Sequence, residues 1–438
     1  MPRQKIILIG AGSVVFTQVL VADFARTCPP EGLRLCLVDT NPEALDVIAP
    51  LVRRMVERLG ADIEVEASVD RRDVLPDADV VVTTISVGGR RAWETDVLIP
   101  RKYGVFQSVG DTAMPGGISR AARMIPALVA IARDAKALCP NALFFNYANP
   151  MSANCLAIRR ATGVPVIGLC HGTFRTERYL AGLVGIPEDQ SRRVTSLGVG
   201  INHFTFILDL REDGHDLLPD VWERLSADER AGALAHPYSW ELFQRWGAYP
   251  APGDRHVVEF VPERFPDGRY YGKTLGVDAF SFERTVASGD EQYARSVQQA
   301  RGELPFDASH FPKASSSESE QLARMVGAIR RDTRQVFYVN APNDGACAQL
   351  PPGALLELPA VATGRGFRTM QVGEIPPGIA ALLTRRIGVI ELTVEAALRG
   401  DRKLFVEAVL ADGSVSDPAQ ASEMVDELMA AQAPYLAV

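Results

Sequence analysis

The opening segment of the chain is the feature that most constrains its fold. Residues 5–16 read KIILIGAGSVVF, an apolar run followed by a turn with Gly10 and Gly12 and then by the helical pattern of residues 15–27. A buried strand that enters a helix through such a turn places backbone N–H groups where they can hold a pyrophosphate. Two of the three usual glycines are present, and Phe16 stands near the third position. The segment predicts a dinucleotide-binding turn, with an ordinary tight turn as the alternative.

The second apolar run, LCLVD, ends in an acidic residue, Asp39. A carboxylate at the end of this strand can accept hydrogen bonds from ribose hydroxyls, and it would repel a 2′-phosphate. The pair of features therefore favours NAD over NADP. A strand-end aspartate without a ligand is the alternative.

Apolar β-branched runs alternate with helical patterns through the first half of the chain, which is typical of a parallel sheet covered by helices on both faces. We expect a Rossmann-like doubly wound sheet over residues 1–195, like that of lactate and malate dehydrogenases. Within it, Ser119 is a candidate N-cap of a long helix, and VPVIGLC (164–170) reads as a strand. Residues 196–438 are expected to form a C-terminal α/β (α+β) domain for substrate and metal binding and for oligomerisation. The polar stretch KASSSESE (313–320) reads as a helix cap or a loop.

Composition excludes several classes of protein. The net charge of -8 is spread over 438 residues with no Lys/Arg-rich run, so no nucleic-acid partner is expected. The first strand begins at Lys5, which leaves no room for a leader, and no apolar run is long enough for a membrane span. We therefore expect a cytoplasmic protein with no membrane partner. Six cysteines lie without close pairs, which indicates reduced thiols and makes any special cysteine a metal ligand or a nucleophile.

Polar side chains stand at the ends of several predicted strands. Cys170 in VPVIGLCHG and His203 in GINHF are a candidate pair of metal ligands, since a thiolate and an imidazole from two strand ends can bind a divalent ion. Asn149 in NYANPM and Asn202 in GINHF lie where such sheets bind ligands, and their amides can hold sugar hydroxyls. The alternatives are a packed cysteine, a histidine satisfied by a local bond, and turn-forming asparagines.

Six motifs follow one another over nearly the whole chain: GAGS, SVGDTAMPGGISR, NYANPM, GLCHG, GINHFTFI and NAPNDG. Together they resemble the NAD- and metal-dependent glycoside hydrolases of family four, an exception to the two-carboxylate scheme of glycosidases. The resemblance implies that NAD⁺ takes a hydride from C3 of the sugar and that the metal polarises the resulting ketone. A base then removes the acidified C2 proton, and the group at C1 leaves by elimination. Water adds, the steps reverse, and the cofactor ends as it began.

The resemblance also implies roles for particular residues. Cys170 and His203 are the metal ligands, usually of Mn²⁺, and Asn149 and Asn202 hold the substrate. A cation at this place steadies the ketone and its enediolate beside the nicotinamide. The residues expected around the dinucleotide are Gly10, Gly12, Ser13, Phe16, Asp39 and Ser86.

The acid and the base of the implied reaction are assigned by comparison with the phospho-glycosidase members. Those members use a mid-chain tyrosine as the base, whereas the comparable stretch here, AYPAPGDRHVVEF, offers His256. A histidine of near-neutral pKa suits the task, and Tyr249 is the reserve candidate. His171, which follows the cysteine ligand, or Asp111 is expected to protonate the leaving group. Simple binding or structural roles are the alternatives for His256, and a turn residue is the alternative for Asp111.

The sugar is predicted from an arginine beside the expected base. Arg255 can present a bidentate fork to a planar carboxylate such as that of a uronic acid, with Arg90 as a possible helper, and a surface ion pair is the alternative. The stretches GDRHVVEF, SVGDTAMPGG and CHG are similar to the α-galacturonidase branch of the family. The competing functions are an α-galactosidase or α-glucosidase, an NAD-dependent 2-hydroxy-acid dehydrogenase and a non-enzymatic NAD sensor. Family members generally form dimers or tetramers, so a homodimer or homotetramer is expected.

Overall fold

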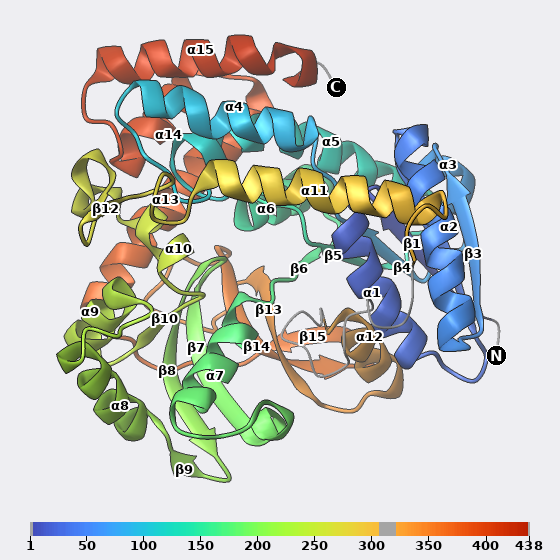
Figure 1. The fold of residues 1–438 in the computed structure, drawn as a ribbon, viewed down its shortest axis with the longest axis horizontal. Helices are drawn as coiled ribbons and strands as arrows, with labels where there is room; N and C mark the ends of the chain where they lie inside the picture. Colours follow the sequence, from blue (N-terminus) through green and yellow to red (C-terminus); the bar gives the residue numbers. More distant parts are fainter. Residues whose placement is uncertain (1–2, 306–320, 437–438) are drawn as a thin grey trace.

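The chain is built around one large mixed sheet with helices on both faces (Figure 1). The computed structural model describes residues 3–305 and 321–436, so the stretch 313–320 lies outside the described residues. The N-terminal strands are all parallel and lie in the order β3-β2-β1-β4-β5-β6. This order is that of dinucleotide-binding doubly wound sheets, and it confirms the predicted fold class.

The elements of the parallel part follow the predicted alternation of strand and helix. They are β1 (Gln4–Ile9), α1 (Val14–Arg26), β2 (Leu33–Val38), α2 (Pro42–Leu59), β3 (Ile63–Ser68), α3 (Arg71–Val74), β4 (Val80–Thr83), α4 (Gly89–Lys102), α5 (Met114–Leu138), β5 (Leu143–Asn146), α6 (Met151–Thr162), β6 (Ile167–Gly168) and α7 (Gly172–Leu183).

Most of the remaining strands extend the same sheet in antiparallel fashion, in the order β6-β13-β14-β7-β8-β10, whereas β11 and β12 form a separate two-stranded sheet. The elements are β7 (Val194–Ile201), β8 (Phe204–Glu212), β9 (His215–Asp216), α8 (Leu218–Arg230), α9 (Pro237–Trp246), β10 (Tyr249–Ala251), α10 (Asp254–Val257), β11 (Arg269–Tyr270), β12 (Lys273–Thr274), α11 (Phe282–Ala300), α12 (Leu322–Arg331), β13 (Val336–Pro342), β14 (Leu355–Thr363), β15 (Gly366–Thr369), α13 (Pro377–Arg399), α14 (Arg402–Asp412) and α15 (Pro418–Leu436).

Local sequence accounts for the boundaries of α2. The side-chain oxygen of Asn41 accepts a hydrogen bond from the Glu43 N–H at 3.0 Å, and Pro42 occupies the first turn. Gly60 ends the helix in the left-handed region, with φ of 63°. The apolar side chains between these ends face the sheet and are buried, so capping and amphipathic spacing together define the element.

Helix α5 begins earlier than predicted. Its first residue is Met114, so Ser119 is not its N-cap. The Ser119 side chain is buried inside the helix and donates a hydrogen bond to Asp96 at 2.8 Å. The preceding glycine pair, Gly116 and Gly117, has the composition of a loop, yet both residues are helical. A Cβ at Gly117 would lie 2.4 Å from the Thr112 backbone, so glycine is needed there for close packing. The glycines that close packing requires made the first turn of the helix look like a loop in the sequence.

The strand predicted over residues 164–170 is also shorter than expected, because β6 contains only Ile167 and Gly168. The Leu169 N–H still donates to the Asn146 carbonyl at 2.9 Å, after which the chain turns into α7. The turn brings Cys170 and the residues after it out of the sheet at its carboxyl edge.

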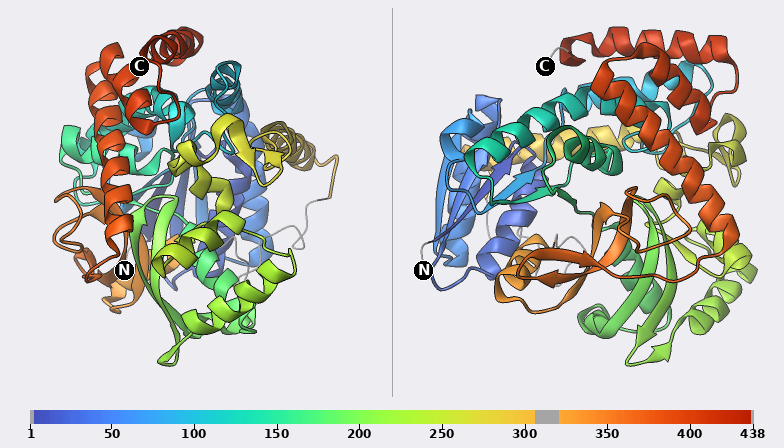
Figure 2. Two further views of the ribbon diagram at one scale, coloured as in Figure 1. Left: turned by 90° about the vertical axis from the view of Figure 1, so that its left-hand side faces the viewer. Right: turned by 180° about the vertical axis from the view of Figure 1, so that it is seen from behind.

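The two halves of the chain share their hydrophobic cores. On one face, α13, α14 and α15 pack against the layer formed by α4, α5 and α6 (Figure 2). On the other face, α11 and α12 pack against α1 and α2. None of the helices in residues 3–305 and 321–436 is long and apolar enough to cross a membrane. The division at residue 195 stays a prediction, since the sheet and both cores run across it.

One row of paired residues crosses the whole sheet and marks where the site begins. From β3 to β10 the row is Ser68, Val38, Ile9, Thr83, Asn146, Gly168, Asn340, Glu357, Gly200, Thr205 and Ala251. The glycine turn, Asp39, Cys170 and His203 all lie within a few residues of this row. The register of the sheet therefore aligns segments that are far apart in the sequence along a single edge.

Candidate active site

The glycine turn after β1 and the acidic residue after β2 form one unit. Gly10 has φ of 97°, and its N–H donates to the Val38 carbonyl at 2.8 Å. The Gly12 N–H donates to Asp39 Oδ2 at 2.8 Å, and the other oxygen of Asp39 accepts from Asn41 N–H at 3.0 Å. A Cβ at Gly12 would lie 2.6 Å from Asp39 Oδ2. Glycine is thus required for the carboxylate to lie against the turn, where a dinucleotide ribose is expected.

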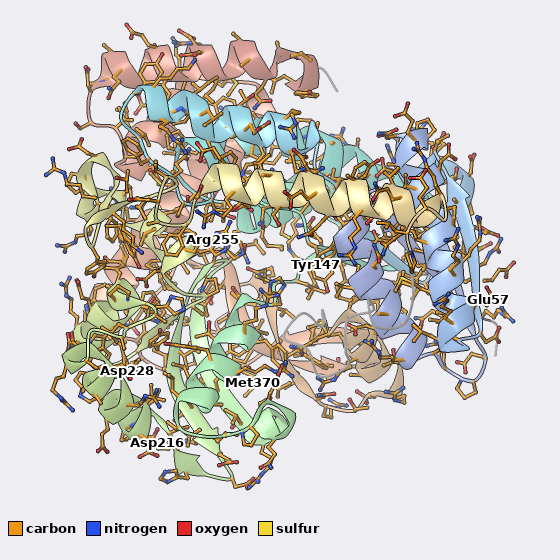
Figure 3. The ribbon with its side chains drawn as sticks, viewed as in Figure 1. Glu57, Tyr147, Asp216, Asp228, Arg255 and Met370 are labelled. Atoms are coloured by element: carbon orange, nitrogen blue, oxygen red, sulfur yellow. The ribbon has the colours of Figure 1, made fainter. Side chains whose placement is uncertain are left out.

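The other residues expected at the dinucleotide come from neighbouring strand ends. Ser13 is exposed directly before α1. Phe16 contacts Tyr147 edge to face, with ring centroids 4.8 Å apart. The Ser86 hydroxyl, after β4, accepts a hydrogen bond from Arg120 Nη2 at 3.0 Å. Tyr147 follows β5 and lies at the carboxyl edge of the parallel strands (Figure 3).

We expect Gly10→Ala to destabilise the protein much more than the matched change Gly60→Ala. Both residues have positive φ, but a Cβ at Gly10 would lie 2.6 Å from the Ile85 backbone nitrogen, whereas Gly60 has no atom within 4 Å. The backbone conformation costs about 1–2 kcal/mol at each position, and overpacking adds about 1–3 kcal/mol at Gly10 alone. Urea unfolding measures the difference, and titration with NAD⁺ measures binding. If Gly10→Ala and Gly60→Ala lost the same free energy of unfolding, the predicted clash at Gly10 would be wrong.

A cluster of three titratable side chains forms the centre of the site. Ligand atoms of Asp111, His203 and His256 all lie within 4.8 Å of one another. The imidazole centroids of the two histidines are 4.1 Å apart. His203 stands in the two-residue turn between β7 and β8 with φ of 66°, and its Nδ1 lies 3.1 Å from the Thr112 hydroxyl. With Nδ1 engaged, Nε2 is the ring nitrogen that can coordinate an ion.

Asp111 is held by its neighbours on both oxygens. Asn149 Nδ2 donates to Asp111 Oδ2 at 2.9 Å, and the Thr112 hydroxyl donates to Oδ1 at 2.7 Å. Asn149 is itself placed by Arg120, whose Nε donates to the Asn149 carbonyl at 3.1 Å. The structure therefore joins the expected acid Asp111 and the expected substrate ligand Asn149 into one hydrogen-bonded group.

The surroundings control the protonation of this cluster. The pKa of His203 is lowered to about 4, mainly by burial; Asp111 opposes this shift and His171 adds to it. Burial and the neighbouring His203 lower the pKa of His256 well below its ordinary value. Burial would raise the pKa of Asp111, but the imidazoles and the Arg120 guanidinium outweigh it, so that this pKa is lowered. Near pH 7 the imidazoles are neutral and have lone pairs for a metal ion or a proton.

Cys170 and His171 precede α7. The Gly172 N–H lies 3.3 Å from Cys170 Sγ and points to it. A Cβ at Gly172 would lie 3.4 Å from Cys170 Sγ and 3.0 Å from the side chain of Pro252, a residue shortly before His256. The cysteine turn thus packs against the segment that carries the expected base. The three-residue cluster itself contains His203 but not Cys170.

Two expected substrate ligands have buried polar atoms without a protein partner among the described residues. Asn149 Oδ1 makes no hydrogen bond, and neither amide atom of Asn202 makes one. Asn202 is 1% exposed and lines a cavity of about 30 Å³ together with Thr112. Buried amides without partners are costly, so these atoms are suited to binding a polar ligand.

The two arginines expected at a substrate carboxylate are placed differently. Arg255 lies in α10 beside His256 (Figure 3), and its Nη2 donates to Thr285 at 3.1 Å while its buried Nε has no partner among the described residues. Arg90, in contrast, donates from Nε to Asp290 at 2.6 Å. The structure supports the ion-pair alternative for Arg90, whereas Arg255 retains a free donor.

Sequence reasoning missed three charged residues that surround the site. Arg120 links Ser86 and Asn149. The Glu259 carboxylate accepts hydrogen bonds from the N–H groups of Val109 and Gly110, at 2.7 and 2.8 Å, and so holds the backbone directly before Asp111. Burial raises the pKa of Glu259 to about 8. Glu357 is also buried. The only local signal was a charged residue inside an apolar run, as in GALLELPAVA.

The family of the chain follows from comparisons with known proteins. A model of family 4 glycosyl hydrolases matches residues 5–186, and the model of their C-terminal domain matches residues 198–415. The chain is 32% identical to an α-glucosidase from Erwinia rhapontici, over 99% of this chain and 98% of that protein. It is 31% identical to an α-galacturonidase from Bacillus subtilis, over 83% of this chain and 84% of that protein. The chain belongs to the family 4 glycosyl hydrolases and is a glycosidase.

Solved structures agree on the fold. A Bacillus subtilis protein described as a glucosidase superposes with a TM-score of 0.84 at 27% identity, covering 98% of this chain and 100% of that one. A 6-phospho-α-glucosidase from gut microorganisms, solved with NAD and Mn²⁺, has a TM-score of 0.80 at 19% identity and covers 99% of each chain. Malate dehydrogenase from Cryptosporidium parvum, at 14% identity and a TM-score of 0.55, covers 91% of this chain and 99% of that one. The predicted likeness to dehydrogenases is confirmed for the fold.

Proposed function

We propose that this glycosidase is an α-galacturonidase, which cleaves α-linked uronides with NAD and Mn²⁺ or another divalent ion. The choice of sugar rests on one observation: the buried Nε of Arg255 has no hydrogen-bond partner among the described residues, and Arg255 adjoins His256. A guanidinium in this position can bind the planar carboxylate at C6 of a uronic acid. The α-galacturonidase among the relatives supports the same choice.

The residues of the site fit both cofactors. Gly10 and Gly12 leave no room for a Cβ where the dinucleotide backbone is expected, and the neutral His203 imidazole beside Asp111 is a suitable donor set for a divalent ion. We assign Cys170 and His203 as the metal ligands. When bound, NAD⁺ supplies a temporary acceptor for the C3 hydride, and the metal supplies a Lewis acid for the resulting ketone.

The chain's own residues bind the sugar and move its protons. In this proposal Asn149 and Asn202 hold hydroxyl groups of the substrate with their unpartnered amide atoms. His256 removes the C2 proton, for which a neutral imidazole is the required form. His171 or Asp111 delivers a proton to the leaving oxygen at C1, and the lowered pKa of Asp111, which keeps its carboxylate ionised near pH 7, favours His171 as the donor. Water then adds at C1 and the proton returns to C2; with NAD bound, the hydride would return to C3, so that no net oxidation would occur.

We expect Arg255→Ala to lower kcat/KM for an α-galacturonide about 10–100-fold, since a charged hydrogen bond contributes about 1.5–3 kcal/mol. Turnover of the matching neutral α-galactoside should be unchanged, because it has no carboxylate. Arg245→Ala, at an exposed position of α9, is the surface control. Steady-state kinetics on the two aryl glycosides measure the ratio. A ratio of uronide to galactoside turnover equal to that of the wild type would refute the assignment of Arg255.

The second candidate function is an α-glucosidase or α-galactosidase, which the α-glucosidase relative at 32% identity favours. A panel of aryl α- and β-glycosides of galacturonate, glucuronate, galactose and glucose separates the candidates, when assayed with NAD⁺, Mn²⁺ and a reducing agent. Absorbance of reduced cofactor gives a further test. A glycosidase releases sugar without net NADH, whereas a 2-hydroxy-acid dehydrogenase produces NADH in proportion to product.

We also propose a cytoplasmic location and a homodimer or homotetramer. The location is supported by the need for an NAD pool and for a reduced Cys170, and no disulfide joins any of the six cysteines, all of which lie among the described residues. Light scattering on the purified protein gives the number of subunits.

A further inference from the structure

Glu357 is a buried acidic residue that connects two separate segments. It lies in β14 and is 2% exposed. The Thr173 hydroxyl donates to Glu357 Oε1 at 2.9 Å, and the Thr205 hydroxyl donates to Oε2 at 3.0 Å. Both threonines are buried. Thr173 follows Cys170 by three residues and Thr205 follows His203 by two, so one carboxyl group holds both ligand-bearing segments.

The backbone ladders that join β6 to β13 and β14 to β7 are short. The register between β6 and β13 consists of the single pair Gly168–Asn340, and that between β14 and β7 of the single pair Glu357–Gly200. A short ladder fixes the relative position of two strands less well than a long one. Cys170 and His203 emerge from β6 and β7, on opposite sides of these short ladders. A side-chain bridge across them adds the constraint that the backbone lacks.

Stability alone does not account for an acidic residue at this position. The two hydrogen bonds come from neutral hydroxyls, and a buried carboxyl group held in this way is costly compared with an apolar side chain of similar size. Side chains that orient metal ligands from behind contribute to metal affinity, and their replacement typically weakens binding or activity about 10–100-fold. The position of Glu357 behind both ligand segments matches that task.

We propose that Glu357 is a positioning residue that sets the distance between Cys170 and His203 through Thr173 and Thr205. The inference rests on the proposed function, because it requires these two residues to bind the ion. Glu357 does not contact the substrate in this proposal, and it acts only through the two threonines.

The test is the affinity of the full-length protein for Mn²⁺, measured from the electron paramagnetic resonance signal of the free ion. We expect Glu357→Leu to weaken Mn²⁺ binding about 10–100-fold. Thr173→Val and Thr205→Val each remove one hydrogen bond without changing size, and each should weaken binding in the same direction. Glu357→Gln retains an acceptor for one threonine and offers a donor to the other, so it should bind Mn²⁺ more tightly than the leucine variant.

The matched control is Glu177→Leu. Glu177 lies in α7, as Thr173 does, and accepts a hydrogen bond from Ser196 of β7, but neither Glu177 nor Ser196 adjoins a proposed ligand. It should leave Mn²⁺ affinity unchanged. The Co²⁺-substituted protein gives a second readout, since the thiolate-to-metal absorption band should shift in the Glu357 and threonine variants but not in the control.

Two results would overturn the proposal. One is wild-type Mn²⁺ affinity in folded Thr173→Val and Thr205→Val variants, and the other is an equal loss in the Glu177 control. Cys170→Ser and His203→Gly distinguish this failure from failure of the proposed function. If those variants also bind Mn²⁺ like the wild type, the assignment of the metal ligands is wrong.

Discussion

Replacing His203 by alanine is expected to lower kcat/KM by about 10³-fold or more, because a Lewis acid contributes several kcal/mol to the stabilisation of a developing oxyanion. The imidazole is held at Nδ1 by the Thr112 hydroxyl, and it lies beside Asp111 and His256. Loss of the ring removes a proposed metal ligand from the centre of the site. Steady-state kinetics with excess Mn²⁺, together with Mn²⁺ titration, measure the effect.

The backbone at this position requires a second variant. His203 has φ of 66°, a conformation that glycine adopts without strain and alanine does not. His203→Gly should therefore be more stable than His203→Ala but equally inactive, and added imidazole should restore part of its activity. If the glycine variant recovered most of the wild-type activity by itself, the effect of the alanine change would be one of backbone strain, and the role of the imidazole would be disproved.

His256→Asn is expected to lower kcat about 10²–10⁴-fold, the usual contribution of a general base. The ring is buried beside His203, with centroids 4.1 Å apart, and its lowered pKa keeps it neutral and able to accept a proton. The base acts at C2, so substrate deuterated at C2 should show a larger isotope effect in the variant than in the wild type. Incorporation of solvent deuterium at C2 of the product is the complementary measurement.

His256 could act as a general base or as a metal ligand, since its ring nitrogens lie close enough to Asp111 and His203 to share an ion with them. Measuring Mn²⁺ binding distinguishes these two roles. A general base can be removed without loss of the ion, so we expect His256→Asn to bind Mn²⁺ like the wild type. Should the variant lose the ion as completely as His203→Gly does, His256 is a third ligand, and the base is another residue. The reserve candidate Tyr249 is less suited, because burial raises its pKa well above the ordinary value.

Several expected site residues come together as predicted, although their contacts were not predictable. Asp111, His203 and His256 form one cluster, and Asn149 is bonded to Asp111. Arg90 was predicted at the substrate, but it is occupied by Asp290 of α11. In the sequence both Arg90 and Arg255 follow closely on a glycine-containing turn. Only the tertiary structure, which places Asp290 of α11 against Arg90, distinguishes an ion pair from a free donor.

The residues behind the site were missed for a related reason. Glu259 and Glu357 stand in apolar runs, and their partners lie 149–150 and 152–184 residues away in the sequence. No local pattern contains such a pairing. A buried carboxyl group is visible in the sequence only as a charge in an apolar run, and its purpose becomes clear once its partners are known.

Local sequence by itself determined the alternation of strands and helices, the glycine turn with Asp39, and the class of the sheet, parallel and doubly wound, because each depends on short-range periodicity, backbone conformation or the right-handed connection rule. The tertiary structure decided how β13, β14, β7 and β8 join the edge of β6, and therefore which distant side chains share one row. Antiparallel pairing of strands far apart in the chain depends on long-range packing and register, which no short segment contains. For this reason the motifs predicted a glycosidase site, while only the assembled sheet brought His203 and His256 into contact.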